Sequence, residues 1–410
     1  MAPTETPVAD TQVLIGRQAI FDAQLQVIGY ELLYRSSQVN AATFSDGDAV
    51  TARVMLNAFL EIGLDQLVGP HRAFINLTTK FLRDQLCEDL PKDRVVLEIL
   101  ENIPMENSVL EAMARLSSQG FTVALDDFEY HEGLRPMVEQ CHMVKLDVMA
   151  LGLERLAAQV AQLRPFNVKL LAEKVETQEE FEFCKGLGLD YYQGYFFSKP
   201  VIVEGASIPP NQMAILTLVG KLQNPDTGMG EIEDIIRQDV ALSYKVLRYV
   251  NSAFFSLSKK VDSIRQAACL VGMARLKTWA TLLVMAGLDN KPLELLMMAL
   301  VRAKMCEEIA FALKESDADE YFTVGLFSVL DALLDKPMDE VLALVELSPS
   351  SRSALLELSG QMGTVLEYVL AYERGDWDAI HSRSLQMDIL RQSYFAALAF
   401  KDSLVPLLNE

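Results

Sequence analysis

Short apolar runs alternate with segments of helical period along the first half of the chain. The runs are VLIGRQAIF, RAFINL, RVVLEIL, FTVALDDF, HMVKLDV, VKLLAEKV and YYQGYFF, all between residues 13 and 197. Helix-period stretches lie between them, at residues 48–63, 106–120 and 178–188. Near-continuous apolar runs are typical of parallel strands that are buried on both faces of a sheet covered by helices. About seven or eight such units in roughly 200 residues predict a TIM-like (β/α) barrel. An open doubly wound sheet is the alternative.

The spacing of apolar residues along the chain changes after Pro200. Residues 201–212 carry a Pro-Pro pair and are typical of a linker. Beyond them, long stretches of helical period follow at residues 213–224, 231–255, 262–287 and 292–314, almost without β-type runs. We therefore predict two domains, a barrel over 12–203 and an all-α domain with a C-terminal helical extension over 204–410.

Polar residues stand at the ends of the apolar runs, about one for each predicted strand. They are Glu31, Asn76, Glu98, Asp126, Asp127, Lys145, Glu173 and Gln193. In a parallel barrel the carboxyl ends of the strands meet at one rim, so these side chains are expected to share a cleft.

Convergence of these five carboxylates would be repulsive without cations. Oxygen ligands of this kind favour hard divalent ions, Mg²⁺ or Mn²⁺. The adjacent Asp126 and Asp127 suit a two-metal site, and such a site with a nearby Lys145 suits phosphodiester hydrolysis. Taken singly, a strand-end acid is more often a helix N-cap and Lys145 an ordinary loop lysine. The joint pattern favours the metal site.

Charge and composition narrow the function further. Fifty-seven acidic residues against 36 basic ones give a formal charge of −21, which disfavours nucleic-acid binding and nucleic-acid processing. Five scattered cysteines form no CxxC pair, so neither a disulfide framework nor a structural zinc site is expected. The N-terminus lacks the pattern of a signal peptide, and the longest uncharged apolar stretch, 278–288, is too short for a membrane span. We expect a cytoplasmic protein without membrane insertion.

Over residues 12–203 the chain resembles the EAL family of cyclic di-GMP phosphodiesterases. The signature reads GYELLYR, so Glu31 and Leu33 match and leucine replaces the middle alanine. Further matches are FIN, LEILE, LDDF, VKLD, AEKVET and QGYFFSKP, in the family's order.

The resemblance implies a role for each matched residue. Glu31, Asn76, Glu98 and Asp126 would hold a first Mg²⁺ or Mn²⁺ ion, and Asp126 and Asp127 a second. Lys145 would bind water and phosphate, Glu173 would be the general base, and Glu176 would brace the adjoining loop. The surface that binds cyclic di-GMP would include Gln18, Leu33, Arg35, Gln193 and Pro200, with Gln193 also supporting the metal site through a water.

Two departures from the family pattern adjoin these ligands. The glycine-rich loop that usually follows Asp-Asp-Phe, and that helps the domain to dimerise, reads Glu-Tyr-His-Glu at 129–132 here. Lys174 replaces the glycine of the usual Glu-Gly-Val-Glu-Thr. A residue other than glycine strains a turn of positive φ, so we expect the 129–132 loop to be shaped differently.

The second half resembles the HDOD domain, on the stretches at 208–227, 231–255 and 263–276. That resemblance implies a protein-interaction role. Arg248 and Asn251 are either anchors for a partner or, more simply, residues that form hydrogen bonds within the helical domain. The leading hypothesis is a bacterial signalling protein that hydrolyses cyclic di-GMP to linear pGpG, with a possible homodimer and a protein partner on the HDOD domain. The alternative is a catalytically inactive EAL domain that serves as a cyclic di-GMP receptor or a scaffold.

Overall fold

The computed structural model divides into two compact units. One comprises Met1–Phe196 with Glu373–Trp377, and the other Phe197–Tyr372 with Asp378–Glu410. The structure describes mainly residues 13–36, 63–77, 90–100, 105–196, 218–224, 226–237, 263–285, 291–345, 347–381 and 385–408, with a few single or paired residues between these stretches. The helix expected over 48–63, apart from its last residue, and the linker at 201–212 lie outside the described residues.

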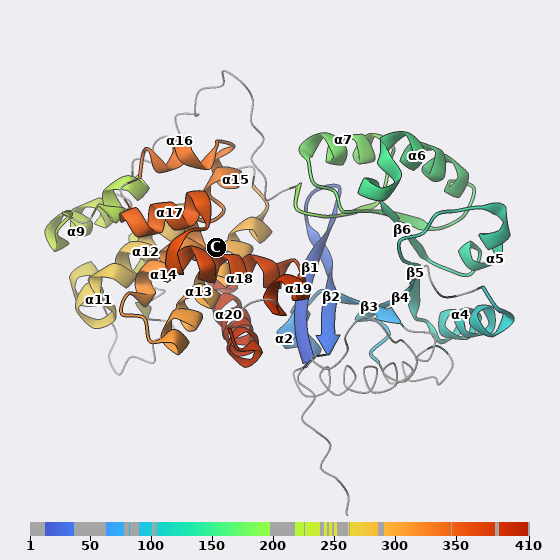
Figure 1. Ribbon diagram of the computed structural model, residues 1–410, viewed down its shortest axis with the longest axis horizontal. Helices are drawn as coiled ribbons and strands as arrows, with labels where there is room; N and C mark the ends of the chain where they lie inside the picture. Colours follow the sequence, from blue (N-terminus) through green and yellow to red (C-terminus); the bar gives the residue numbers. More distant parts are fainter. Residues whose placement is uncertain are drawn as a thin grey trace, which may run out of the picture. The chain divides into compact units, whose positions relative to one another are not determined.

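Within the described residues, eight strands close into a barrel in the order β1 to β8. The strands are β1 (Val13–Asp22), β2 (Val27–Ser36), β3 (Arg72–Leu77), β4 (Val95–Ile99), β5 (Thr122–Leu125), β6 (Met143–Asp147), β7 (Lys169–Glu173) and β8 (Tyr191–Gln193). The first unit's helices are α2 (Leu64–Val68), α4 (Asn107–Gln119), α5 (Arg135–Val138), α6 (Val148–Leu163) and α7 (Gln178–Gly186), with a 3₁₀ turn at Glu132–Leu134. In Figure 1, α4, α5, α6 and α7 lie around the outside of the strands. The TIM-like barrel is confirmed, and the open sheet is excluded.

One strand departs from the expected all-parallel arrangement. β1 runs antiparallel to both of its neighbours, β2 and β8, whereas β2 to β8 are mutually parallel. The reason lies in the short β1–β2 connection, because a parallel crossover needs a dozen or more residues. Asp22 closes this connection as its Oδ1 accepts hydrogen bonds from the backbone N–H groups of Gln24 and Gln26, both at 2.9 Å.

The described part of the second unit contains helices and their connections and no strand. Its helices are α9 (Met229–Arg237), α11 (Ile264–Val271), α12 (Met273–Met285), α13 (Leu293–Leu313), α14 (Ala318–Phe327), α15 (Leu330–Leu334), α16 (Met338–Leu342), α17 (Pro349–Glu357), α18 (Gly360–Glu373), α19 (Trp377–His381) and α20 (Met387–Leu408). This confirms the all-α prediction. None of the described helices is long and apolar enough to cross a membrane.

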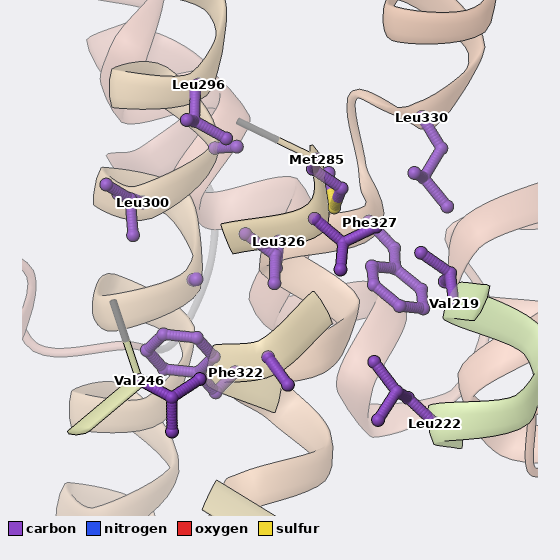
Figure 2. Close-up of a cluster of buried hydrophobic side chains, with 14 of the residues drawn as sticks. Val219, Leu222, Val246, Met285, Leu296, Leu300, Phe322, Leu326, Phe327 and Leu330 are labelled. Atoms are coloured by element: carbon purple, nitrogen blue, oxygen red, sulfur yellow. The ribbon is translucent and has the colours of Figure 1, made fainter. Parts of the chain in front are cut away.

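A continuous apolar core joins most of these helices, with residues from α9, α11 to α16 and α20. Figure 2 shows Leu296 and Leu300 of α13 facing the cluster that Phe322, Leu326 and Phe327 of α14 complete. The two helices approach closely at Gly325, where an added Cβ would lie 2.6 Å from the Ala303 Cα and from the Arg302 carbonyl oxygen. The glycine is therefore required by packing.

Asn251 has a structural role in this domain. Its side-chain amide donates to the carbonyl oxygens of Leu247 and Val261 at 2.8 and 2.7 Å, and its Oδ1 accepts from the Val261 N–H at 2.7 Å. These bonds match the simpler interpretation, in which Asn251 forms hydrogen bonds within the helical domain. Arg248 lies outside the described residues.

Candidate metal centre

Two successive layers of side chains fill the inside of the barrel. The first is apolar and consists of Ile20, Phe74, Val96, Ala124, Met143 and Leu171. Alternate residues of a strand face the same side, so the residue two positions further along each parallel strand also faces inward. Those residues are Asn76, Glu98, Asp126, Lys145 and Glu173, and on the antiparallel β1 the equivalent is Gln18, two positions before Ile20. The second layer, toward the carboxyl ends of β2 to β8, is therefore polar.

Lys145 lies at the centre of the polar layer. Its side chain is fully buried, and its Nζ lies 2.6 Å from oxygens of Glu98, Asp126 and Glu173 and 3.3 Å from Glu31 Oε2. An ammonium has three N–H donors, fewer than four carboxylates need. Both oxygens of Glu98 and Oδ1 of Asp126 are buried and receive no hydrogen bond of good geometry.

Two side-chain amides orient Glu31. Asn76 Nδ2 donates to Glu31 Oε1 at 3.0 Å, and Gln193 Nε2 donates to Glu31 Oε2 at 2.6 Å. Gln193 Nε2 also reaches Gln18 Oε1 at 2.9 Å. The amides of β3 and β8 thus fix the carboxylate of β2 across the barrel.

The crowding of carboxylates shifts their protonation. Burial raises the pKa of Glu173 to about 8, with Asp126 and Glu31 adding to the rise and Lys145 opposing it. Burial likewise raises the pKa values of Glu98 and Asp126. Burial acts against the charge of Lys145 too, but the surrounding carboxylates raise its pKa well above the ordinary value. Lys145 is therefore cationic, whereas burial and crowding favour the protonated forms of Glu98, Asp126 and Glu173 when no cation is bound.

Glu31 differs from the other acids of the layer. Burial alone would raise its pKa, but Lys145 and the donors Gln193 and Asn76 together lower it. Glu31 is therefore the acid of this layer that stays ionised most readily.

The donor set fits a divalent cation. One oxygen each from Glu31, Glu98 and Asp126 lies within 4.8 Å of the others, and all three residues are buried. Four buried carboxylates around one ammonium leave a formal charge of −3, and carboxylate oxygens are the ligands that hard divalent ions prefer. The predicted convergence at one rim is thus observed for all of the predicted strand-end residues except Asp127.

Asp127 turns away from Lys145 toward a second lysine. Its backbone has φ 46°, and its Oδ1 lies 3.3 Å from Lys174 Nζ. Lys174 also pairs with Asp147 at the end of β6. Burial would lower the pKa of Lys174, but these two aspartates raise it above the ordinary value.

The loop after Asp127 is held by side chains. The Tyr130 N–H donates to Gln159 Oε1 at 2.7 Å, Gln159 Nε2 returns a bond to the Tyr130 carbonyl, and the Tyr130 hydroxyl donates to Glu132. Glu129 pairs with Arg155 on α6. No residue of 129–132 has positive φ, so the left-handed conformation falls on Asp127 instead. Specific contacts to α6 thus take the place of glycines.

The other predicted site residues either lie apart from Lys145 or lie outside the part of the chain that the structure describes. Leu33 is half-buried on β2, two positions beyond Glu31 and hence on the same face of the strand. Glu176 is half-buried in the β7–α7 connection, where its N–H donates to Glu180 Oε2 at 2.8 Å. The backbone of Arg35 belongs to β2, but its side chain lies outside the described part, and so does all of Pro200.

Sequence reasoning missed Asp147 and the contacts of Lys174. The signal for Asp147 was present, because it stands two positions after Lys145 on β6 and therefore faces the same side. The Lys174 contacts had no such signal, since they join the end of β7 to residues 27 and 47 positions away.

Family models match both halves of the chain. The EAL domain model matches residues 41–200 and the HDOD domain model residues 208–362. The EAL match begins after Glu31, whose place in the site comes from the pairing of β2 with β1 and β3.

Two curated relatives cover nearly the whole chain. The cyclic di-GMP phosphodiesterase CdgJ of Vibrio cholerae serotype O1 is 33% identical over 93% of this chain and 90% of its own length. The uncharacterized protein YuxH of Bacillus subtilis is 31% identical over 92% of this chain and 94% of its own. Among solved structures, the PaMucR phosphodiesterase in complex with c-di-GMP is 21% identical, with a TM-score of 0.39, over 49% of this chain and 99% of that one. On the strength of the two full-length relatives and the two domain matches, the chain belongs to the family of proteins that join an EAL domain to an HDOD domain.

Proposed function

We propose that this protein hydrolyses cyclic di-GMP to linear pGpG at the polar layer of its barrel, with two divalent cations, Mg²⁺ or Mn²⁺. The observation that carries the proposal is the buried group of four carboxyl groups around Lys145, more than the three donors of one ammonium can satisfy. The similarity to CdgJ over 93% of the chain supports the same substrate.

The ligand roles follow from the position of each residue. Glu31, Glu98 and Asp126 would hold the first cation together with Asn76, while Asp126 and Asp127 would hold the second. The cations, when bound, would lower the pKa of a coordinated water and neutralise charge on the phosphoryl oxygens. Gln193 keeps Glu31 oriented through its 2.6 Å hydrogen bond.

Glu173 is the proposed general base. Burial raises the pKa of Glu173 to about 8, and this supports the role, because a carboxylate of raised pKa is a stronger base toward water. As the water oxygen bonds to phosphorus, the bond from phosphorus to the 3′ oxygen breaks, and that oxygen leaves with a proton. Lys145, cationic and fully buried, would stabilise the charge that develops on the phosphoryl group.

Residues outside the layer complete the proposed substrate site. Gln18, Leu33, Arg35 and Pro200 would contact the dinucleotide, and Glu176 would brace the β7–α7 loop next to Glu173. These roles rest on the match of GYELLYR, AEKVET and QGYFFSKP to the EAL pattern.

Purified full-length protein with Mn²⁺ should convert cyclic di-GMP to pGpG. Glu31→Gln should abolish turnover because it removes a charged cation ligand, whereas Glu111→Gln, on the exposed face of α4, should not. Equal amounts of intact cyclic di-GMP with the wild type, with Glu31→Gln and without protein would refute the proposal.

A second function, reception of cyclic di-GMP without cleavage, is favoured by the Lys174 contact. An ammonium 3.3 Å from Asp127 Oδ1 opposes a second cation at that carboxylate. Calorimetry decides between the two functions: binding of cyclic di-GMP in the presence of Mn²⁺, with no pGpG formed, would establish a receptor.

We also propose where the protein is located and what it binds. The scattered cysteines, which form no CxxC pair in the sequence, support a cytoplasmic location. We further propose that the HDOD domain binds a protein partner and that the protein forms a homodimer. Light scattering and affinity capture with the HDOD segment as bait would test these assignments.

A further inference from the structure

Lys174 bridges two carboxylates at the mouth of the metal centre. Its Nζ lies 3.3 Å from Asp127 Oδ1 and pairs with Asp147 Oδ2. Asp147 is a fixed anchor, because its other oxygen caps α6 by accepting a hydrogen bond from the Ala150 N–H at 2.8 Å. The ammonium is therefore held on one side by the N-cap residue of α6 and faces Asp127 on the other.

The backbone supports this placement. Lys174 has φ 54°, a left-handed conformation that glycine adopts at lower cost than lysine. The chain is fixed on both sides, since Glu173 belongs to β7 and the Val175 N–H donates to the Gln193 carbonyl at 3.0 Å. A lysine at this position thus costs conformational energy and contributes two ion pairs.

The position of the ammonium matters because of what lies next to it. Asp126, adjacent to Asp127, contacts Lys145 at 2.6 Å and shares its oxygen cluster with Glu31 and Glu98. Glu98 is fully buried, and neither of its oxygens receives a hydrogen bond of good geometry, which marks the first cation position. Asp127 carries the carboxylate for the second cation and already faces a positive charge.

We propose that Lys174 is a built-in competitor for the second divalent cation. Its charge occupies Asp127 and repels an incoming cation, so the second position fills only at higher metal concentration than the first. This role rests on the two-cation site of the proposed function and makes Lys174 a residue that sets metal affinity, not a catalytic residue.

Manganese titration of the full-length protein without nucleotide tests the proposal. Calorimetry and the electron paramagnetic resonance signal of free Mn²⁺ would resolve a tight and a weaker step in the wild type. Lys174→Met keeps nearly the same side-chain length and removes the charge. It should tighten Mn²⁺ binding in the weaker step about tenfold, a change of about 1.4 kcal/mol in binding free energy. The tighter step should stay unchanged. The matched control, Lys174→Arg, keeps the charge and should stay within about twofold of the wild type on both steps.

Three results would overturn the proposal. They are an unchanged weaker step in Lys174→Met, an equal tightening of both steps, and the absence of a weaker step in the wild type and in all variants. Lys174→Gly controls for misfolding, because glycine removes the charge and adopts the positive φ at lower cost than lysine. It must show the same shift in Mn²⁺ affinity as Lys174→Met. These isotherms do not depend on turnover. A protein that binds two Mn²⁺ ions without cleaving cyclic di-GMP would refute the proposed hydrolysis and leave the role of Lys174 to be decided by the variants.

Discussion

Replacing Lys145 with methionine removes the cation that touches four buried carboxylates. Methionine fills nearly the same volume, so the change tests charge more than packing. Nζ lies 2.6 Å from three of the carboxylates and 3.3 Å from the fourth, and the side chain is fully buried. Breaking a single buried ion pair by removing one partner costs about 3–5 kcal/mol. We expect at least this loss in the free energy of unfolding of the barrel when metal is chelated.

Scanning calorimetry in EDTA measures the loss. For a domain of about 150–250 residues, each kcal/mol lowers the melting temperature by about 2–4 °C, so the barrel transition should fall by roughly 6–20 °C. Mn²⁺ should recover part of the difference, because cations bind the carboxylates only in the folded state. Leu153→Met, an exposed apolar position on α6, is the control and should leave the transition in place.

The pH dependence of this loss has a definite sign. Between its ordinary pKa of 4.5 and its folded pKa of about 8, Glu173 holds a proton when folded and has lost it when unfolded. The folded state then binds more protons, so the stability of the metal-free barrel falls as the pH rises through this window. Without Lys145 the folded pKa values rise further, so the gap between the variant and the wild type should widen toward pH 8 and narrow toward pH 5. A variant whose metal-free melting temperature stays within about 2 °C of the wild type at pH 8 would refute the charge argument.

Three further changes follow from the same structure. Glu98→Gln copies the protonated form that burial favours, so in EDTA its barrel should melt at or above the wild-type temperature, while the rise on adding Mn²⁺ should disappear; a preserved rise would exclude Glu98 as a ligand. Glu173→Gln removes the proposed base and should lower kcat by about 10²- to 10⁴-fold, with Mn²⁺ binding by calorimetry retained; kcat within a few-fold of the wild type would exclude that role. Gly325→Ala places a Cβ 2.6 Å from backbone atoms of α13 and should destabilise the helical unit by about 1–3 kcal/mol with the barrel transition unmoved; an unshifted helical transition would show that the helices separate without cost.

Much of the barrel could be predicted because its strands are buried on both faces. Runs such as RVVLEIL have no polar interruption before the strand end, so Glu98 stands out in the sequence. The period of two along each strand then places the next inner-face residue in the polar layer, as it does for Phe74 and Asn76. The direction of β1 could also have been predicted, since four residues cannot hold a crossover helix.

Other features depended on contacts that a linear sequence does not contain. The central position of Lys145 among four carboxylates comes from strands β2, β4, β5 and β7 meeting across the barrel. The pairing of Lys174 with Asp127 and Asp147 depends on two local backbone choices, φ 46° at Asp127 and φ 54° at Lys174. The EAL pattern indicates that Lys174 replaces a glycine, but it does not predict which carboxylates the ammonium reaches.

Anomalous diffraction from crystals grown with Mn²⁺ tests the central claim most directly. The claim is that the carboxylates of Glu31, Glu98 and Asp126, whose oxygens lie within 4.8 Å of one another, bind a divalent cation at the mouth of the barrel. We predict a manganese peak about 2.0–2.1 Å from an oxygen of each of the three residues, the range of Mg²⁺-like coordination. A Mn²⁺-saturated crystal with no peak there, and with Lys145 still the partner of all four carboxylates, would contradict the account.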